Sequence, residues 1–211
     1  NIEIIFNNSF FELPVFTCHN CNHYFINNLN PNEIQKYYDE TYWSVFRNIH
    51  NKKIVNQKFD NEYIFKKLPI FLQKIIDLIG VRKAVAYSQF NYLKSNLNGT
   101  KLLEIGPGEG FMLELFEKNG FDVLGVEPSK DNQPIINKKL KNGKSQIGFV
   151  ENLPTFDKKF DIIIMSHVLE HVIDCRAVLY NLQNTLTKNG IIFIEVPNCE
   201  NKKIMTHSIN M

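Results

Sequence analysis

The chain has 211 residues, a formal net charge of +2 from 24 basic and 22 acidic side chains, and 44% hydrophobic residues. This composition is typical of a folded globular protein and excludes the low hydrophobicity and high net charge of disordered chains. No apolar run approaches the ~18 residues of a transmembrane helix, and the near-neutral charge does not indicate a nucleic-acid partner. Four cysteines are too few for a disulfide scaffold. We therefore expect a cytoplasmic protein without membrane insertion or a signal peptide.

Residues 1–31 are expected to be an irregular, aromatic-rich segment whose distinctive feature is a Cys-x-x-Cys pair, Cys18 and Cys21. Such a pair is half of a tetrahedral zinc site, which needs two further ligands. Cys175 and Cys199 lie in the last part of the chain, residues 99–211, and are poorly placed to complete it. His19 and His23 could substitute as ligands, although adjacent residues seldom coordinate one ion well. We therefore predict no bound metal, with Cys18 and Cys21 as the ligands to test first if zinc is found.

Residues 32–98 show helical spacing of apolar side chains and are expected to form a helical lid or connector. Pro31 and Asn32 suit a helix start. An apolar stripe runs from Phe59 to Ile79, and a further helix fits Arg82–Leu97.

Residues 99–211 alternate between short apolar runs and helical patterns. Alternation of this kind predicts an α/β fold with a doubly wound, mainly parallel sheet covered on both faces. Ligands of such sheets bind at the carboxyl ends of the strands. Strands are expected at Lys101–Ile105, Phe121–Val126, Gln146–Val150, Asp161–Met165 and Ile191–Val196, and helices at Phe111–Asn119, after Pro128-Ser129 and from about Glu170 to Leu186.

The sharpest motif is the loop from Glu104 to Gly110, in which Gly106, Gly108 and Gly110 alternate with other residues. It follows a strand and opens a helix, where glycines let a ligand approach the main chain closely. A turn without a ligand is the alternative. A dinucleotide loop would have the spacing G-x-G-x-x-G, which is absent here. The acid two residues before the first glycine suits an ammonium group better than a phosphate.

These segments together resemble class I S-adenosylmethionine-dependent methyltransferases with a Rossmann-like fold. The resemblance rests on the runs Leu102–Gly110, Val123–Ser129, Phe160–Val172 and Gly190–Asn198. It implies that Glu104 faces the methionine moiety of the cofactor S-adenosyl-L-methionine and that the three glycines pack against the cofactor. It also implies that the strands of this family that follow the fifth strand are missing from this sequence.

Four further positions are assigned to the cofactor. Glu127 ends the second strand, where a carboxylate can accept both ribose hydroxyls, the alternative being a solvated acid. Phe149 and Val150 correspond to the adenine-binding segment, although many relatives have an acid where Phe149 stands. The resemblance places Ser166 beside the sulfonium.

The segment after the fourth strand contains His167, Glu170 and His171, which would project from one side of a helical turn. Three interpretations stay open. Either histidine could be a general base that removes a proton from a substrate hydroxyl. The trio could bind a divalent metal, or it could serve only capping and packing.

The segment from Phe16 to Trp43 is similar to the one that leads into bacterial methyltransferases associated with sugars and surface polysaccharides, in which an upstream Cys pair completes a zinc knuckle. The resulting hypothesis is methyl transfer to an oxygen of a small, sugar-containing acceptor. The alternatives are a catalytically silent module that binds the cofactor and a nicotinamide-dependent oxidoreductase. The sequence does not indicate an oligomeric state.

Overall fold

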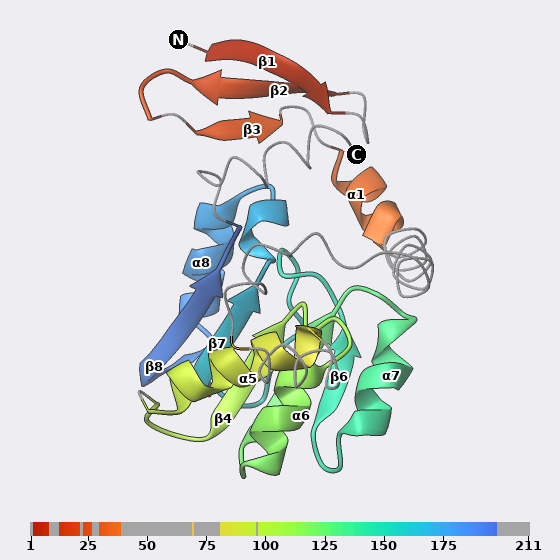
Figure 1. The fold of residues 1–211 in the computed structure, drawn as a ribbon, viewed down its shortest axis with the longest axis vertical. Helices are drawn as coiled ribbons and strands as arrows, with labels where there is room; N and C mark the ends of the chain where they lie inside the picture. Colours follow the sequence, from red (N-terminus) through yellow and green to blue (C-terminus); the bar gives the residue numbers. More distant parts are fainter. Residues whose placement is uncertain are drawn as a thin grey trace. The chain divides into compact units, whose positions relative to one another are not determined.

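The computed structural model describes residues 2–8, 13–21, 23–26, 30–38, 69, 81–95 and 97–197. The chain divides into two compact units, which are described separately. Unit 1 comprises Asn1–Gln35 with Val196–Met211, and unit 2 comprises Lys36–Glu195 (Figure 1). The expected stripe from Phe59 to Ile79 lies outside the described residues.

Unit 1 contains a three-stranded antiparallel sheet, so the expectation of an irregular segment over residues 1–31 is wrong. Its strands are β1 (Ile2–Asn8), β2 (Leu13–Cys18) and β3 (Tyr24–Ile26), in the order β1-β2-β3. Val15 and Thr17 are buried at alternate positions of β2, which is the period of a strand with one covered face. Helix α1 (Pro31–Tyr37) follows and begins where the Pro31-Asn32 pair predicts.

Unit 2 is built on a five-stranded sheet in which every neighbouring pair is parallel. The strand order is β6-β5-β4-β7-β8. The strands are β4 (Lys101–Ile105), β5 (Asp122–Glu127), β6 (Lys144–Ile147), β7 (Phe160–Ser166) and β8 (Leu186–Glu195). The middle of β4 and of β7 is fully buried, as a sheet covered on both faces requires. This arrangement confirms the predicted doubly wound α/β fold.

Helices form a layer on each face of this sheet (Figure 1). On one face, α5 (Val81–Lys94) and α6 (Phe111–Lys118) contribute to a cluster of buried apolar side chains that includes Leu102, Ile162 and Ile164. Helix α7 (Asn132–Lys139) adds Ile136 to the same cluster. On the other face, α8 (Cys175–Gln183) packs on a second cluster through Val178 and Leu182.

Most element boundaries differ from the sequence prediction by a residue or more, and three elements show why. Strand β6 begins and ends two to three residues earlier than expected. Strand β8 begins earlier, because the expected Asn189-Gly190 turn lies inside a register irregularity of that strand. In place of one helix from Glu170, the structure has a short 3-10 turn, η2 (Leu169–His171), followed by the separate helix α8. Helix α8 starts anew because the Asp174 carboxylate caps it, accepting a hydrogen bond from the Ala177 N–H at 2.9 Å.

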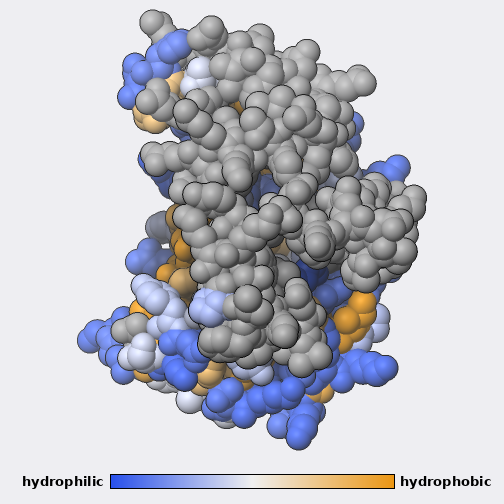
Figure 2. All heavy atoms as spheres, in the orientation of Figure 1, coloured by the Kyte–Doolittle hydropathy of each residue, from blue (hydrophilic) through white to orange (hydrophobic). Residues whose placement is uncertain are grey.

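Hydrophilic side chains dominate the described surface on the face drawn in Figure 2, with hydrophobic groups scattered between them. Within the described ranges, none of the helices combines the length and the apolar composition needed to span a bilayer.

Candidate functional site

The carboxyl ends of four strands of unit 2 lie at one level. Their parallel register places Glu127, Gly106, Ser166 and Glu195 in a row across β5, β4, β7 and β8. Neighbouring strands are ~4.8 Å apart, so the row is about 14 Å long. The chain order reverses between β4 and β7, since β5 and β6 lie on one side of β4 and β7 and β8 on the other. Such a switch point is where doubly wound sheets bind their ligands.

The glycine loop between β4 and α6 packs closely against its neighbours. Gly106 has a φ of 66° and Gly110 a φ of 75°, values that strain any residue with a Cβ. A Cβ on Gly106 would lie 2.6 Å from Cγ2 of Val168, and one on Gly110 would lie 3.0 Å from Cγ2 of Ile136. A larger residue at either position would displace the loop from the strand ends.

Glu127 is only 2% exposed, and three N–H donors hold its carboxylate. Oε2 accepts a hydrogen bond from the Gly108 N–H at 2.9 Å, while Oε1 accepts from the Ser129 N–H at 3.1 Å and from Nδ2 of Asn132 at 3.3 Å. These charge-assisted bonds fix the direction of the carboxylate and tie the glycine loop to β5. The ribose-binding role of Glu127 stays a prediction. The sequence did not single out Asn132, because a buried amide in the next helix is not part of any motif.

Glu104 lies in β4, two residues before Gly106, and is 6% exposed. Its Oε2 is buried without a hydrogen-bond partner among the described residues. Burial, together with the nearby Glu127 charge, raises the pKa of this carboxyl to about 8, and the Leu113 N–H opposes the shift. The acid is therefore mostly protonated at neutral pH. A buried carboxyl oxygen without a partner is a place where a cationic or hydrogen-bond-donating ligand group would be stabilised.

Ser166 belongs to a hydrogen-bonded cluster that joins α5 to the ends of β7 and β8. Its Oγ donates to Oε2 of Glu195 at 2.7 Å, and Nε2 of Gln89 donates to the Ser166 Oγ at 3.0 Å. Gln89 also donates to the same oxygen of Glu195. The contact of Ser166 with a cofactor stays a prediction. Gln89 and Glu195 were missed at the sequence level because only the register of β7 and β8 brings them together.

The two histidines meet at one carboxylate, although not on a helical turn as expected. His167 lies before η2 with a φ of 55°, the one positive φ of a non-glycine residue among those described. Its Nδ1 is 3.4 Å from Oε1 of Glu170, and Nε2 of His171 is 3.7 Å from the same oxygen. The expectation that His167, Glu170 and His171 project from one helical turn is therefore wrong, although the three side chains do lie close together.

The two imidazoles differ in their surroundings. Burial lowers the pKa of His171, the charge of His167 lowers it further, and Glu170 opposes the shift. The Tyr38 ring packs edge-on against His171 with a centroid distance of 5.9 Å. A neutral imidazole at neutral pH is the form that can accept a proton. The role of His167 and His171 as a base stays a prediction.

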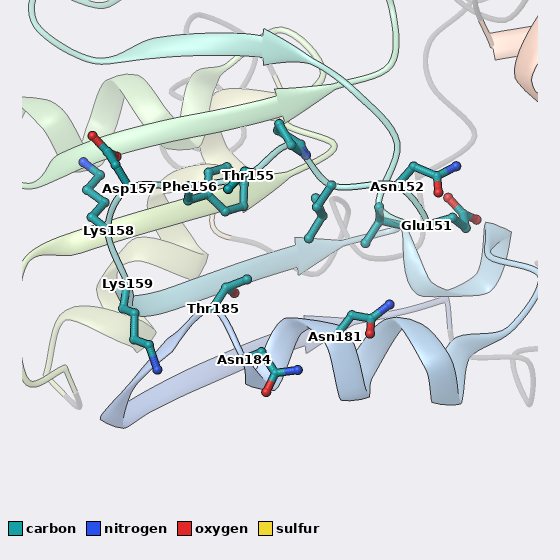
Figure 3. A pocket seen from close by; sticks show the side chains of 13 residues that line it. Glu151, Asn152, Thr155, Phe156, Asp157, Lys158, Lys159, Asn181, Asn184 and Thr185 are labelled. Atoms are coloured by element: carbon teal, nitrogen blue, oxygen red, sulfur yellow. The ribbon is translucent and has the colours of Figure 1, made fainter.

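Phe149 and Val150 lie in the connection from β6 to β7, where an isolated bridge pairs Phe149 with Asn152. Val150 is buried. A groove of about 690 Å³ lies between this connection and α8, and Figure 3 shows Asn181 and Asn184 on the α8 side of it. The connection contains no helix in the described structure, which leaves this part of the α8 face open. The adenine-binding role of Phe149 and Val150 stays a prediction.

The cysteine pair of unit 1 lies at the turn between β2 and β3. The backbone N–H groups of Asn20 and Cys21 lower the pKa of the Cys18 thiol. Within the described ranges, no three or more His, Cys, Asp or Glu side chains are arranged as metal ligands. This result gives no support to zinc at the cysteines or to a divalent metal at His167, Glu170 and His171.

Comparison with known proteins identifies the family. Residues 82–208 match the family model described as a methyltransferase domain, which covers more than half of the chain. The chain belongs to the methyltransferase domain family. This membership confirms the methyltransferase resemblance seen in the sequence.

Three of the individual proteins that the chain resembles share 30% sequence identity with it or less. A ubiquinone biosynthesis O-methyltransferase of Pelagibacter ubique is 28% identical over 181 residues, which are 82% of this chain and 67% of the relative. A tRNA U34 carboxymethyltransferase of Campylobacter jejuni is 30% identical over 138 residues, 62% of this chain and 47% of that protein. A crystal structure of the plantazolicin methyltransferase BpumL with SAH and a triazolic desmethylPZN analogue has a TM-score of 0.51 at 21% identity, covering 58% of this chain and 48% of BpumL. This last likeness shows the fold alone. The chain thus spans from about half to two thirds of the length of these proteins.

Proposed function

We propose that this protein binds S-adenosylmethionine at the carboxyl edge of β4 and β5 and transfers its methyl group to an oxygen of a small, hydroxyl-bearing acceptor. The observation that supports this proposal most directly is the pair of buried acids, Glu104 and Glu127, on either side of the glycine loop.

The residues at this edge fit the two ends of the cofactor. Glu127, fixed by three donors, is placed to accept the ribose hydroxyls. The orphaned oxygen of Glu104 suits the cationic amino-acid end. A nicotinamide dinucleotide would instead bring a pyrophosphate to the loop, whose glycines lack the G-x-G-x-x-G spacing that receives it. The oxidoreductase alternative is therefore disfavoured.

The work left to the protein is alignment and proton removal. Bound S-adenosylmethionine supplies a methyl group already activated by the positive sulfur. The glycine loop and Glu127 fix the adenosine end, so that the methyl group points to where the acceptor binds. A hydroxyl nucleophile must also lose a proton, and we assign its uptake to His171 or His167.

Two observations bear on the acceptor. The similarity of the segment from Phe16 to Trp43 to methyltransferases of surface polysaccharides supports a sugar-containing molecule. The ubiquinone biosynthesis relative is named as an O-methyltransferase, which supports a hydroxyl nucleophile. We therefore propose oxygen as the methylated atom and a sugar-containing precursor as the first acceptor to test.

Two measurements test the proposal. Calorimetric titration should show binding of S-adenosylhomocysteine and none of NADH. Incubation of the chain with a metabolite extract and methyl-labelled S-adenosylmethionine should then transfer label to a hydroxylated small molecule. Binding without any transfer would favour the catalytically silent module, and binding of NADH in place of S-adenosylhomocysteine would overturn the proposal.

A further inference from the structure

The cluster of Glu195, Ser166 and Gln89 lies on the same face of the sheet as the glycine loop. Ile164 of β7 packs with α5 and α6, and Ser166 stands two residues later, so both face this side. Phe193 packs on the same cluster, and Glu195 follows it at the same spacing in β8.

The cluster also lies beyond the cofactor loop in the row of strand ends. Glu127 is one strand to one side of Gly106, while Ser166 is one strand and Glu195 two strands to the other side. With Glu127 and Glu104 assigned to the cofactor, the ends of β7 and β8 are the part of the row left for an acceptor.

Hydrogen bonds orient the carboxylate of Glu195 through one of its two oxygens only, among the described residues. Both side-chain donors, Ser166 and Gln89, contact Oε2. Oε1 accepts no hydrogen bond from the described residues. A carboxylate oxygen held in this way can accept a hydrogen bond from a ligand without first losing another partner.

We propose that Glu195 binds the methyl acceptor by accepting a hydrogen bond from a donor group beside its nucleophilic hydroxyl, with Ser166 and Gln89 as positioning residues; the proton of the nucleophilic hydroxyl itself goes to the histidine base. This inference rests on the proposed function and adds the residue that selects the acceptor. The negative charge of Glu195 favours neutral or cationic acceptors and disfavours those with an anionic group beside the nucleophile.

The test needs no acceptor. Sinefungin is an analogue of S-adenosylmethionine in which a carbon bearing an amine replaces the methylated sulfur, so it presents an ammonium group where the methyl group would emerge. S-adenosylhomocysteine has no group at that position. The ratio of the two dissociation constants, measured by calorimetry at pH 7 and physiological salt, therefore reports on a carboxylate facing the methyl position.

The parent chain should bind sinefungin about tenfold more tightly than S-adenosylhomocysteine, the size expected of a charge-assisted hydrogen bond near solvent. In Glu195→Gln this ratio should fall to about one while the affinity for S-adenosylhomocysteine is unchanged. Gln89→Leu keeps the negative charge of Glu195 but removes one of the two hydrogen bonds that orient its carboxylate, so it should lower the ratio partially. This variant takes the place of Glu195→Gln in the test if Glu195→Gln does not fold. Asp157→Asn is the matched control, because it removes one exposed negative charge from the groove on the α8 face and should leave the ratio unchanged.

A ratio near one in the parent, or an unchanged ratio in Glu195→Gln, would overturn the assignment of Glu195. Failure of the parent to bind either ligand would instead contradict the proposed function.

Discussion

Binding of the cofactor should release a proton from Glu104. The carboxyl has a pKa of about 8, so at pH 7 its neutral form exceeds its charged form by about tenfold. A cationic ligand group beside the orphaned oxygen favours the carboxylate. If the carboxylate is fully formed in the complex, binding releases about 0.9 proton at pH 7, and affinity rises by about tenfold per pH unit up to about pH 8.

Calorimetry in two buffers of different ionisation enthalpy, phosphate and Tris, measures this proton directly. S-adenosylhomocysteine should release it, and 5′-methylthioadenosine, which lacks the amino-acid end, should not. Glu104→Gln keeps the shape of the side chain but cannot ionise, so its binding should be independent of buffer. Binding of S-adenosylhomocysteine to the parent without proton release, and with constant affinity between pH 6 and 8, would refute the reasoning.

The raised pKa of Glu104 also makes the folded chain less stable as pH rises. Because the pKa of Glu104 is raised from 4.5 to about 8, the folded chain binds more protons than the unfolded chain between these values. The stabilisation of the folded state by protonated Glu104 is therefore fully present below pH 4.5 and is lost as pH rises through 8. The free energy of unfolding falls by about 1.4 kcal/mol per pH unit at most. Urea denaturation of the parent and of Glu104→Gln should show this slope in the difference between their free energies of unfolding.

Three further predictions follow from the site. Asn132→Leu should weaken S-adenosylhomocysteine binding by about 1 kcal/mol, because Glu127 loses a donor. Gln133→Leu, a control in the same helix, loses only the hydrogen bond that Nε2 of Gln133 donates to the Ser145 carbonyl and should bind normally. Equal affinities of Asn132→Leu and the parent, measured by calorimetry, would exclude the positioning role of Asn132. Replacement by Asn of the histidine that acts as the proposed base, His171 or His167, should lower kcat on the acceptor found by labelling by roughly 10²–10⁴-fold with unchanged cofactor affinity. Because the pKa of His171 is lowered, the parent rate should rise with pH through an ionisation below 6.5 that this variant lacks; full kcat in both variants would leave the histidines as packing residues. Elemental analysis of the purified chain should find less than one zinc per chain, since the described residues assemble no metal-ligand set, and one tightly held zinc would contradict this.

The sequence predicts the two strands β4 and β5 well because each is a mainly apolar run followed by glycine or proline. Lys101–Ile105 is correct to the residue, since Gly106 and Pro107 cannot extend it. The strands of unit 1 were missed because the segment around Cys18 is short and polar at its turn, which hides the period of two.

The site was predictable only where function depends on a local motif. Glu104, the glycines and Glu127 each stand next to a turn that the sequence marks. Asn132 and Glu195 were not recognised, because their contacts depend on strand register and on how helices pack over the sheet. The left-handed conformation of His167 separates it from η2, and no local residue pattern indicates that break.

The central claim is that the glycine loop and the strand-end acid form an S-adenosylmethionine site, and calorimetric titration with S-adenosylhomocysteine tests it most directly. The parent should bind one molecule per chain. Gly108→Val should abolish binding while the thermal unfolding transition remains, because this loop residue has a φ of 57° and its N–H holds the Glu127 carboxylate. No binding to the parent, or equal binding to a folded Gly108→Val variant, would contradict the claim.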